Sequence, residues 1–343
     1  MQNTENFIRK WIADGYAGDV AVAIGNRGGE TYRYFCSDRG EVLNGKTLFD
    51  MMSVSKILTV APLVQIAIEE GKITADDRLG DYFPEAPDDK ADIPLWMLLS
   101  HCSGILRRDF PEYTTGERHG EVAKFILSFP LAFTPGSKYV YSCGNFILLG
   151  FLLERVFNKP LDLLADDRIF RPLGMKNTGF LPAEDENIVR STRSAYEGRN
   201  KCSDIENRRL YGVSGNAGIF SCIDDMSVFG RSLLCEHKTL MKPETFAYAR
   251  HDYAKDLEMG RSLGYVYVDR RYAQAGGLYS DGTVGHTGFS GTECFADFAN
   301  DLYVVSLTNT AYYAVLMTGD PTNKTATFRT GLHNAMALDL GMK

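Results

Sequence analysis

Ser53-Val54-Ser55-Lys56, followed directly by the apolar run Ile57-Leu-Thr-Val-Ala-Pro-Leu-Val-Gln-Ile-Ala-Ile-Glu-Glu-Gly71, is the most informative stretch of this chain. The run has the length of a helix and ends in glycine, a residue that commonly stops helices. If Ser53 opens that helix, Lys56 lies one turn further on the same face, within reach of the serine hydroxyl. Unpaired N–H groups at the helix start would also suit an oxyanion. The same spacing more often marks an N-cap serine and a solvated lysine, so chemistry can be assigned only with further segments.

Size and composition are those of a globular protein. The chain has 343 residues, of which 44% are hydrophobic and 24% charged, which predicts one large domain or two intimate ones. The formal charge is −7 with no basic block, which argues against nucleic-acid partners and against a polybasic membrane patch. We find no apolar run long enough for a membrane span. The expected partner is therefore a small molecule, and nothing indicates an oligomeric state.

Cysteine usage and the N-terminal segment suggest an intracellular setting. Met1-Gln-Asn-Thr-Glu-Asn-Phe-Ile-Arg-Lys-Trp11 lacks the basic start and apolar core of a secretory signal, so a cytoplasmic protein is expected if Met1 is the native start. The seven cysteines are scattered without a Cys-x-x-Cys pair, which favours reduced thiols. No His-Glu-x-x-His, phosphate-binding loop or Gly-x-Ser-x-Gly elbow occurs, so we expect no metal or cofactor.

The order of elements predicts an α+β fold. A helix is expected near 4–14, and strands over 19–24 and 31–35 joined as a hairpin. The chain from 55 to about 245 is predicted to be mostly helical. Strands are expected again over 263–268, 283–287, 292–296 and 302–307, with a last helix over 324–339. We predict one antiparallel sheet built from both ends of the chain, flanked by helices, in a single domain 1–343 with sub-lobes 1–50 plus 250–343 and 51–249.

Two later segments add candidate groups. In Pro135-Gly-Ser-Lys-Tyr-Val-Tyr141-Ser-Cys143-Gly-Asn145, a turn leads to Tyr141, whose hydroxyl could exchange protons near Ser53; the alternative is a core tyrosine. In Gly285-His286-Thr287-Gly288-Phe289-Ser-Gly-Thr292, glycine in a strand suggests close approach of a backbone or ligand; the alternative is a hairpin with a hydrogen-bonded histidine.

These three segments, in this order, carry a family resemblance. The sequence resembles the serine β-lactamase and penicillin-binding-protein superfamily, in its branch of class C β-lactamases, DD-peptidases and β-lactamase-fold esterases. Further segments are similar to family wording from about residue 18 to the C-terminus: Thr47–Ser53, Glu69–Asp77, Leu98-Leu-Ser-His-Cys-Ser-Gly104, Ile169-Phe-Arg-Pro-Leu-Gly-Met-Lys-Asn-Thr-Gly-Phe180 and Gly215-Asn-Ala-Gly-Ile-Phe-Ser221.

The resemblance implies roles for the motif residues. Ser53 would be the nucleophile that takes the acyl group, with Lys56 helping to remove its proton and Tyr141 passing protons to the leaving group. The backbone N–H groups of Ser53 and Phe289 would form the oxyanion hole. Four residues would border the substrate: Cys143, His286, Thr287 and Gly288.

Two departures from the family pattern bear on specificity. Cys143 stands where the family usually has asparagine, and a thiol cannot reproduce a carboxamide's hydrogen bonds; a shifted register using Asn145 is the alternative. His286 stands where β-lactamases usually carry lysine, and a neutral imidazole attracts a carboxylate less strongly. Arg107 and Arg108 could supply cations at the rim, although a solvated pair is the simpler interpretation.

The leading hypothesis is a serine hydrolase that acts on a small ester or amide through a Ser53 acyl-enzyme. The alternatives are a penicillin-binding-type D-amino peptidase, a β-lactamase or an acyltransferase, and a catalytically lapsed binding or scaffold protein. Specificity is expected to reside in loops at about 105–120 and 185–212.

Overall fold

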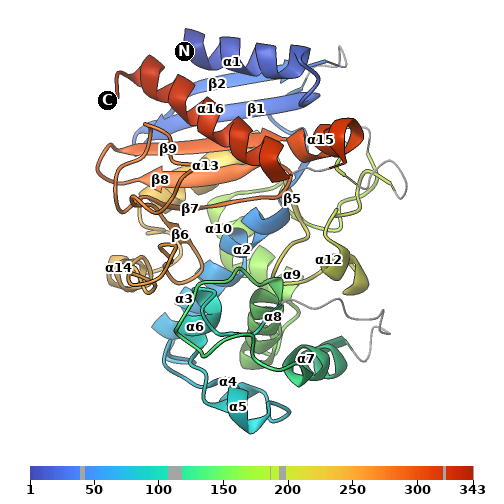
Figure 1. The fold of residues 1–343 in the computed structure, drawn as a ribbon, viewed down its shortest axis with the longest axis vertical. Coiled ribbons are helices and arrows are strands. Elements are labelled where there is room, and N and C mark those ends of the chain that lie inside the picture. The colour runs from blue at the N-terminus through green and yellow to red at the C-terminus, as the bar shows by residue number, and fades with distance from the viewer. Residues whose placement is uncertain (39–42, 107–117, 186, 193–197, 320–321, 343) are drawn as a thin grey trace.

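The largest sheet joins the two ends of the chain. The computed structural model of the protein describes residues 1–38, 43–106, 118–185, 187–192, 198–319 and 322–342. The strands lie in the order β2-β1-β9-β8-β7-β6, and every neighbouring pair is antiparallel. Their bounds are β1 (Asp19–Asn26), β2 (Gly29–Ser37), β6 (Val266–Tyr267), β7 (Val284–Thr287), β8 (Glu293–Asp297) and β9 (Leu302–Thr308). The predicted α+β class, with terminal strands in one antiparallel sheet, is confirmed (Figure 1).

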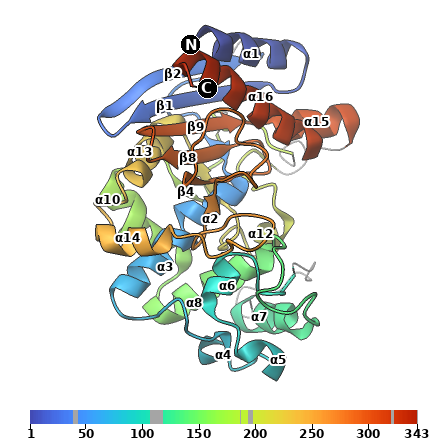
Figure 2. The same cartoon turned by 60° about the vertical axis from the view of Figure 1, so that its left-hand side comes forward.

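Helices cover both faces of this sheet. Helices α1 (Gln2–Ala13) and α16 (Thr322–Leu340) pack side by side on one face, and α13 (Ile223–Leu234) packs on the other (Figures 1 and 2). Strand β1 shows the alternation that this requires, because Val20 and Val22 join the core cluster of α1 and α16 while Ala21 and Ala23 join the main core. The alternating strand thus sets which helix each face receives.

The middle of the chain forms the helical region below the sheet in Figure 1. Its first helices are the 3₁₀ turn Met52–Val54, α2 (Ser55–Leu58), α3 (Val60–Glu69), α4 (Leu79–Tyr82), α5 (Asp88–Ala91), α6 (Leu95–Leu99) and α7 (Arg118–Ser128). Then follow α8 (Cys143–Phe157), α9 (Leu161–Ala165), the π-turn Asp166–Phe170, α10 (Arg171–Leu173), α12 (Ile205–Arg209) and α14 (Pro243–Ala249), and α15 (Thr310–Thr318) precedes α16. A second sheet, not anticipated from the sequence, orders β3 (Phe49–Asp50), β5 (Ile219–Ser221) and β4 (Gly179–Phe180) as β3-β5-β4.

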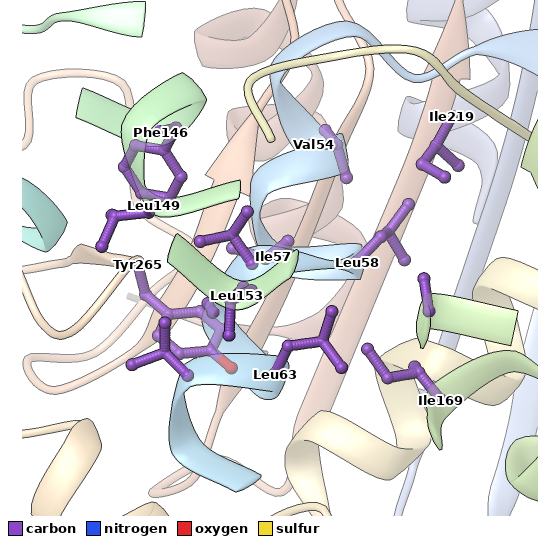
Figure 3. Close-up of a cluster of buried hydrophobic side chains, with 14 of the residues drawn as sticks. Val54, Ile57, Leu58, Leu63, Phe146, Leu149, Leu153, Ile169, Ile219 and Tyr265 are labelled. Carbon is purple, nitrogen blue, oxygen red and sulfur yellow. The ribbon is translucent and has the colours of Figure 1, made fainter. Parts of the chain in front are cut away.

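The core between the lobes is built on the helix that follows Ser53. Figure 3 shows Ile57, Leu58 and Leu63 of α2 and α3 beside Leu149 and Leu153 of α8, and all five side chains are fully buried. Full burial of a leucine stabilises a fold by about 2 kcal/mol, so this packing fixes the helix firmly in the interior. The residues that carry Ser53 and Lys56 therefore stand on a rigid base.

The predicted helix after Ser53 is broken once. Thr59 has φ −130° and ψ −78°, which separates α2 from α3, and its hydroxyl donates to the Ser55 carbonyl oxygen at 2.7 Å. Pro62 supplies the physical reason, because it lacks the N–H that would bond the Leu58 carbonyl and its ring crowds that turn. The break confines Ser55–Leu58 to one turn, directly behind the nucleophile candidate.

The strand predicted over 263–268 is wrong in length, because only Val266–Tyr267 is extended. Gly264 has φ +94°, a conformation that favours glycine, and its N–H donates to the Ser262 carbonyl oxygen. A side chain there would lie 2.5 Å from Ala61 Cβ, so the turn packs tightly against α3. This close approach replaces the first half of the expected strand.

One described segment is long and apolar enough to pass the test for a membrane span, so our statement that no apolar run has that length is wrong. The segment is Met52–Glu69, and 83% of it is buried inside the fold. Burial of that extent is typical of a core helix, and the test alone is weak evidence for a membrane span.

Candidate active site

Ser53 is presented by a strained turn at the end of β3. Met52, the residue before it, has φ +48°, which is unusual for a side chain other than glycine. The Met52 N–H donates to Asp50 Oδ1 at 3.0 Å, and Asp50 pairs with Phe220 in the small sheet. The β3–β5 pairing and the Asp50 carboxylate together hold Met52 in its strained backbone conformation, directly before Ser53.

Lys56 lies one turn after Ser53 and has no exposed surface. Its Nζ donates to Ser53 Oγ at 3.0 Å and to the Asn216 carbonyl oxygen at 2.8 Å. The amine also lies 5.0 Å from the ring centroid of Tyr141 and 5.5 Å from that of Phe146. The solvated-lysine alternative is therefore excluded by the geometry.

Tyr141 reaches Ser53 from the other side. Its hydroxyl donates to Ser53 Oγ at 2.7 Å, just before α8 begins. Loss of solvent raises the pKa of Tyr141 well above its usual value although the residue is 38% exposed, and the hydrogen bond to Ser53 opposes this shift. Tyr141 is thus a neutral phenol at pH 7. The Ser53 oxygen lies within hydrogen-bond reach of two groups that can receive or return its proton.

Cys143, not Asn145, occupies the third place of the second motif. Cys143 Sγ is 4.0 Å from Lys56 Nζ. Asn145 Oδ1 instead accepts a hydrogen bond from the Ser103 hydroxyl at 2.9 Å. The shifted register is therefore not adopted. All seven cysteines of the chain are thiols in this structure.

The third motif places glycine where no side chain fits. A Cβ on Gly288 would lie 2.2 Å from Thr292 Oγ1 and 2.7 Å from the Met51 carbonyl oxygen. The end of β7 thereby lies against the turn that carries Ser53, with Thr287 paired to Glu293 of β8. In the described part of the chain, no acceptor outside the regular helices and strands bonds the backbone N–H groups of Ser53 and Phe289. Two free donors from neighbouring segments are what an oxyanion requires.

His286 carries no charge at neutral pH. Its Nδ1 lies 2.8 Å from the Thr287 carbonyl oxygen, so Nδ1 is the protonated nitrogen. Burial lowers the pKa of His286 well below its usual value, and the charges of Arg261 and Lys56 lower it further. The imidazole offers a substrate no fixed positive charge, which agrees with the electrostatic expectation for this replacement of lysine.

Three residues near the site were not singled out from the sequence. His101 Nδ1 accepts the Ser142 N–H at 3.1 Å, and its ring centroid lies 4.5 Å from that of Tyr141. Asn216 supplies the carbonyl that binds Lys56. Both lie in segments that we quoted only for resemblance. Arg261 is 4% exposed and stacks 4.9 Å from the Tyr139 ring centroid; it precedes a turn, and no sequence pattern indicates it.

Some of the predicted residues lie outside the part of the chain that the structure describes. Arg107 and Arg108 lie outside the described residues, as do parts of both predicted specificity loops. Within the described ranges, no group of three or more His, Cys, Asp or Glu side chains could hold a metal ion.

The Asp50 carboxylate predicts a pH-dependent stability. Burial raises the pKa of Asp50 to about 6, although hydrogen bonds from Ser203 N–H and Met52 N–H favour the charged form. The folded state therefore holds the proton more tightly than the unfolded chain, in which the pKa is near 3.8. This contribution to the free energy of unfolding is complete below pH 3.8 and is lost as the pH rises through about 6.

Replacing Asp50 by asparagine should remove this dependence. The free energy of unfolding of Asp50→Asn minus that of the wild type should rise by about 2–3 kcal/mol between pH 4 and pH 7. Urea denaturation at several pH values measures it, and taking the difference cancels the other carboxyl groups. A constant difference over this range would show that the Asp50 pKa is not raised.

Comparisons with known proteins agree with this fold. The family model described as Beta-lactamase matches residues 5–327. A protein of Escherichia coli K12 named "Putative D-alanyl-D-alanine carboxypeptidase" is 28% identical over 326 residues, covering 83% of this chain and 73% of the relative. The N-acetylmuramyl-L-alanine amidase of Bacillus subtilis 168 is 25% identical over 366 residues, covering 92% of this chain and 82% of the relative.

Solved structures share the whole fold at low sequence identity. EstCE1, described as a hydrolase with promiscuous acyltransferase activity, superposes with a TM-score of 0.74 at 22% identity, covering 97% of this chain and 98% of its own. The octameric penicillin-binding protein homologue of Pyrococcus abyssi gives 0.75 at 19% identity, covering 99% of this chain and 77% of its own. At these identities the likeness concerns the fold.

Proposed function

Because this chain belongs to the beta-lactamase family, we propose that it hydrolyses a small ester or amide through an acyl-enzyme on Ser53. One observation carries the proposal: Ser53 Oγ lies 3.0 Å from Lys56 Nζ and 2.7 Å from the Tyr141 hydroxyl oxygen. A serine is a weak nucleophile until a neighbouring base takes its proton. Lys56 in its neutral form can take this proton, and Tyr141 can supply a proton to the leaving group.

The proposed reaction has two steps. Ser53 Oγ attacks the substrate carbonyl carbon while its proton passes to Lys56 in its neutral form, and the N–H groups of Ser53 and Phe289 stabilise the oxyanion. Tyr141 then gives its hydroxyl proton to the leaving alcohol or amine as that bond breaks, and it regains a proton from the Lys56 ammonium, since both groups reach Ser53 Oγ. Water attacks the acyl-enzyme in the second step, gives its proton back through the same groups, and releases the acid and the free serine.

A cavity lined by residues between 181 and 220 has room for a small molecule. It has a volume of about 430 Å³ and is lined by residues including Cys202, Asn207 and Phe220. Phe220 is the strand partner of Asp50, and the Cys202 thiol donates to the Asp50 carboxylate at 3.5 Å, but none of Ser53, Lys56 and Tyr141 lines this cavity. The specificity loop proposed over 185–212 contributes most of its wall.

A second candidate is a peptidase or acyltransferase of the penicillin-binding type. The names of the two relatives refer to D-alanyl-D-alanine carboxypeptidase and N-acetylmuramyl-L-alanine amidase activities, and EstCE1 is described as a hydrolase with promiscuous acyltransferase activity. Cys143 beside Lys56 distinguishes the candidates, because a thiol cannot pair with a peptide amide as a carboxamide does. We therefore place the ester hydrolase first.

The test is intact-mass analysis after parallel exposure to a penicillin, a cephalosporin, a short-chain chromogenic ester and a fluorophosphonate. We expect one fluorophosphonate adduct per chain, mapped to Ser53, and a burst of ester hydrolysis. Slow stable labelling by penicillin with poor ester turnover would favour the peptidase. Failure of every reagent to label Ser53 would indicate a lapsed binding protein.

Restoring the family's asparagine should change the preference. Cys143→Asn is expected to raise the rate of acylation by penicillin by about tenfold, because the carboxamide can bond both Lys56 and a substrate amide. Stopped-flow acylation rates measure the change. Cys143→Ser is the matched control, since it adds polarity at the same buried position without the amide. Unchanged or lower β-lactam reactivity in Cys143→Asn would refute this role for Cys143.

A further inference from the structure

A buried cluster of ionisable groups lies behind the end of β7. Arg329 and His333 come from α16, and Glu293 comes from β8, directly opposite Thr287. Arg329 is 4% exposed and the other two are fully buried. Such a cluster is costly to bury, and the chemistry of Ser53, Lys56 and Tyr141 does not use it directly.

The cluster fixes the position of the arginine. His333 Nε2 lies 2.8 Å from Glu293 Oε1, and Nδ1 lies 2.6 Å from the Gln274 carbonyl oxygen. Both ring nitrogens face acceptors, so the ring is held between Glu293 and the Gln274 backbone. Glu293 Oε2 in turn lies 3.9 Å from Arg329 Nε, and Gln274 Oε1 accepts from Arg329 Nη1 at 3.1 Å. The guanidinium is held on two sides.

The remaining arm of Arg329 bonds the backbone of the third motif. Its Nη2 donates to the Gly288 carbonyl oxygen, which also accepts the Gly291 N–H at 3.1 Å. In a trans peptide the carbonyl and the following N–H point in opposite directions, and no peptide bond in the described chain is cis. Drawing the Gly288 oxygen toward α16 therefore turns the Phe289 N–H away from α16.

The same turn is tied to the segment that carries Ser53. The Ser290 hydroxyl donates to the Asp50 carbonyl oxygen at 3.2 Å, and the Thr292 hydroxyl to that of Met51 at 3.4 Å. The Gly288 carbonyl oxygen is therefore bonded to α16, and the residues that follow Phe289 are bonded to the Ser53 turn. The segment from Gly288 to Thr292 thus contacts both Arg329 of α16 and the turn that carries Ser53.

We propose that Arg329, braced by Glu293 and His333, is a positioning residue that orients the Phe289 N–H of the oxyanion hole. The proposal rests on the function proposed above. It adds that a residue of the C-terminal helix, 276 positions after Ser53 in the sequence, sets the direction of an oxyanion-hole N–H. Arg329 does not touch the substrate. It acts through the peptide plane that it bonds.

The test uses a pair of substrates that differ at the oxyanion alone, an ester and its thionoester. Sulfur accepts hydrogen bonds weakly, so a well-placed N–H favours the oxygen ester. Removing an oxyanion donor costs about 10²–10³ in kcat, and misorienting one should cost less. For Arg329→Met we expect kcat for the ester to fall about 10–100-fold with KM within about twofold, and the ester-to-thionoester rate ratio to fall by a similar factor.

Controls separate positioning from simple support of the fold. Asn334→Ala removes a side chain of the same helix that caps Gly277 N–H, and it should leave the rate ratio unchanged. Arg329→Lys keeps one donor near the Gly288 oxygen and should retain an intermediate ratio; it also carries the test if the methionine variant does not fold. A variant that unfolds at lower temperature but keeps the wild-type rate ratio would overturn the proposal.

The failure of this inference differs from failure of the proposed function. If wild-type Ser53 forms no adduct with any reagent, both are overturned. If wild type is acylated and the ratio is insensitive to Arg329, only the positioning role is overturned.

Discussion

Ser53→Ala is expected to lower kcat/KM for a reactive ester by at least about 10⁴-fold and to abolish the covalent adduct. The alanine variant lacks the hydroxyl oxygen that both Lys56 Nζ and the Tyr141 hydroxyl reach. No acyl group can then be transferred to the chain, and only binding and the N–H donors remain to assist water. Steady-state rates and intact mass measure the two effects together.

The loss should come from chemistry, because the fold keeps its other contacts. Lys56 retains its bond to the Asn216 carbonyl oxygen in the variant, so we expect the free energy of unfolding to change by less than about 1 kcal/mol. Ser55→Ala is the matched control: Ser55 is fully buried, and its hydroxyl oxygen accepts the Ile219 N–H at 3.1 Å. It should lose about 1–2 kcal/mol of stability and keep most of its activity. An adduct of unchanged yield on Ser53→Ala would show that another residue is the nucleophile.

Lys56→Met should reduce kcat by about 10³–10⁴-fold with a small change in KM. Methionine is similar in length and can fill the space beside the Tyr141 and Phe146 rings, but it neither donates to Ser53 Oγ nor accepts its proton. The Asn216 carbonyl oxygen also loses its donor, which should cost about 1–3 kcal/mol of stability. Pre-steady-state acylation rates show the loss in the first chemical step.

Two further variants define the role of Lys56. Lys56→Arg keeps a positive charge but cannot act as a base, so a loss as large as that of Lys56→Met supports proton transfer. Retention of more than about a tenth of the activity in Lys56→Arg would instead indicate a purely electrostatic role. Lys90→Met is the control, since Lys90 is also buried but pairs with Asp89 on α5, in a different part of the helical region (Figure 1). It should leave the rates unchanged.

Much of the fold follows from patterns within short stretches of chain. The hairpin over β1 and β2, the late strands β7 to β9 and the last helix lie close to their predicted bounds, because alternation and turn residues are local signals. The small sheet β3-β5-β4 escaped prediction, since strands of two or three residues carry no periodicity. The turn at Gly264 packs closely against α3 and shortens the strand predicted over 263–268. Pro62 lacks a backbone N–H, and the helix predicted after Ser53 is broken before it.

Part of the candidate site could likewise be predicted from the sequence, and part could not. Ser53 and Lys56 are three residues apart in one turn, so their contact could be predicted from spacing alone, and Tyr141, Cys143 and the His286–Phe289 segment came from motif order. Their catalytic roles stay predictions until the variants are measured. The residues that hold these groups in place, including Asp50, Asn216 and Arg329, carry no motif of their own.

The sequence by itself determined the family, the α+β class and the identities of the groups at the candidate site, because each depends on local periodicity or on short motifs in a set order. Only the tertiary structure decided that Cys143 faces Lys56, that His286 is neutral, and that Arg329 bonds the Gly288 carbonyl. These depend on burial and on contacts between segments far apart in the chain. A hydrogen bond from α16 to β7 and a desolvated imidazole arise only when the helices and the sheet close around them.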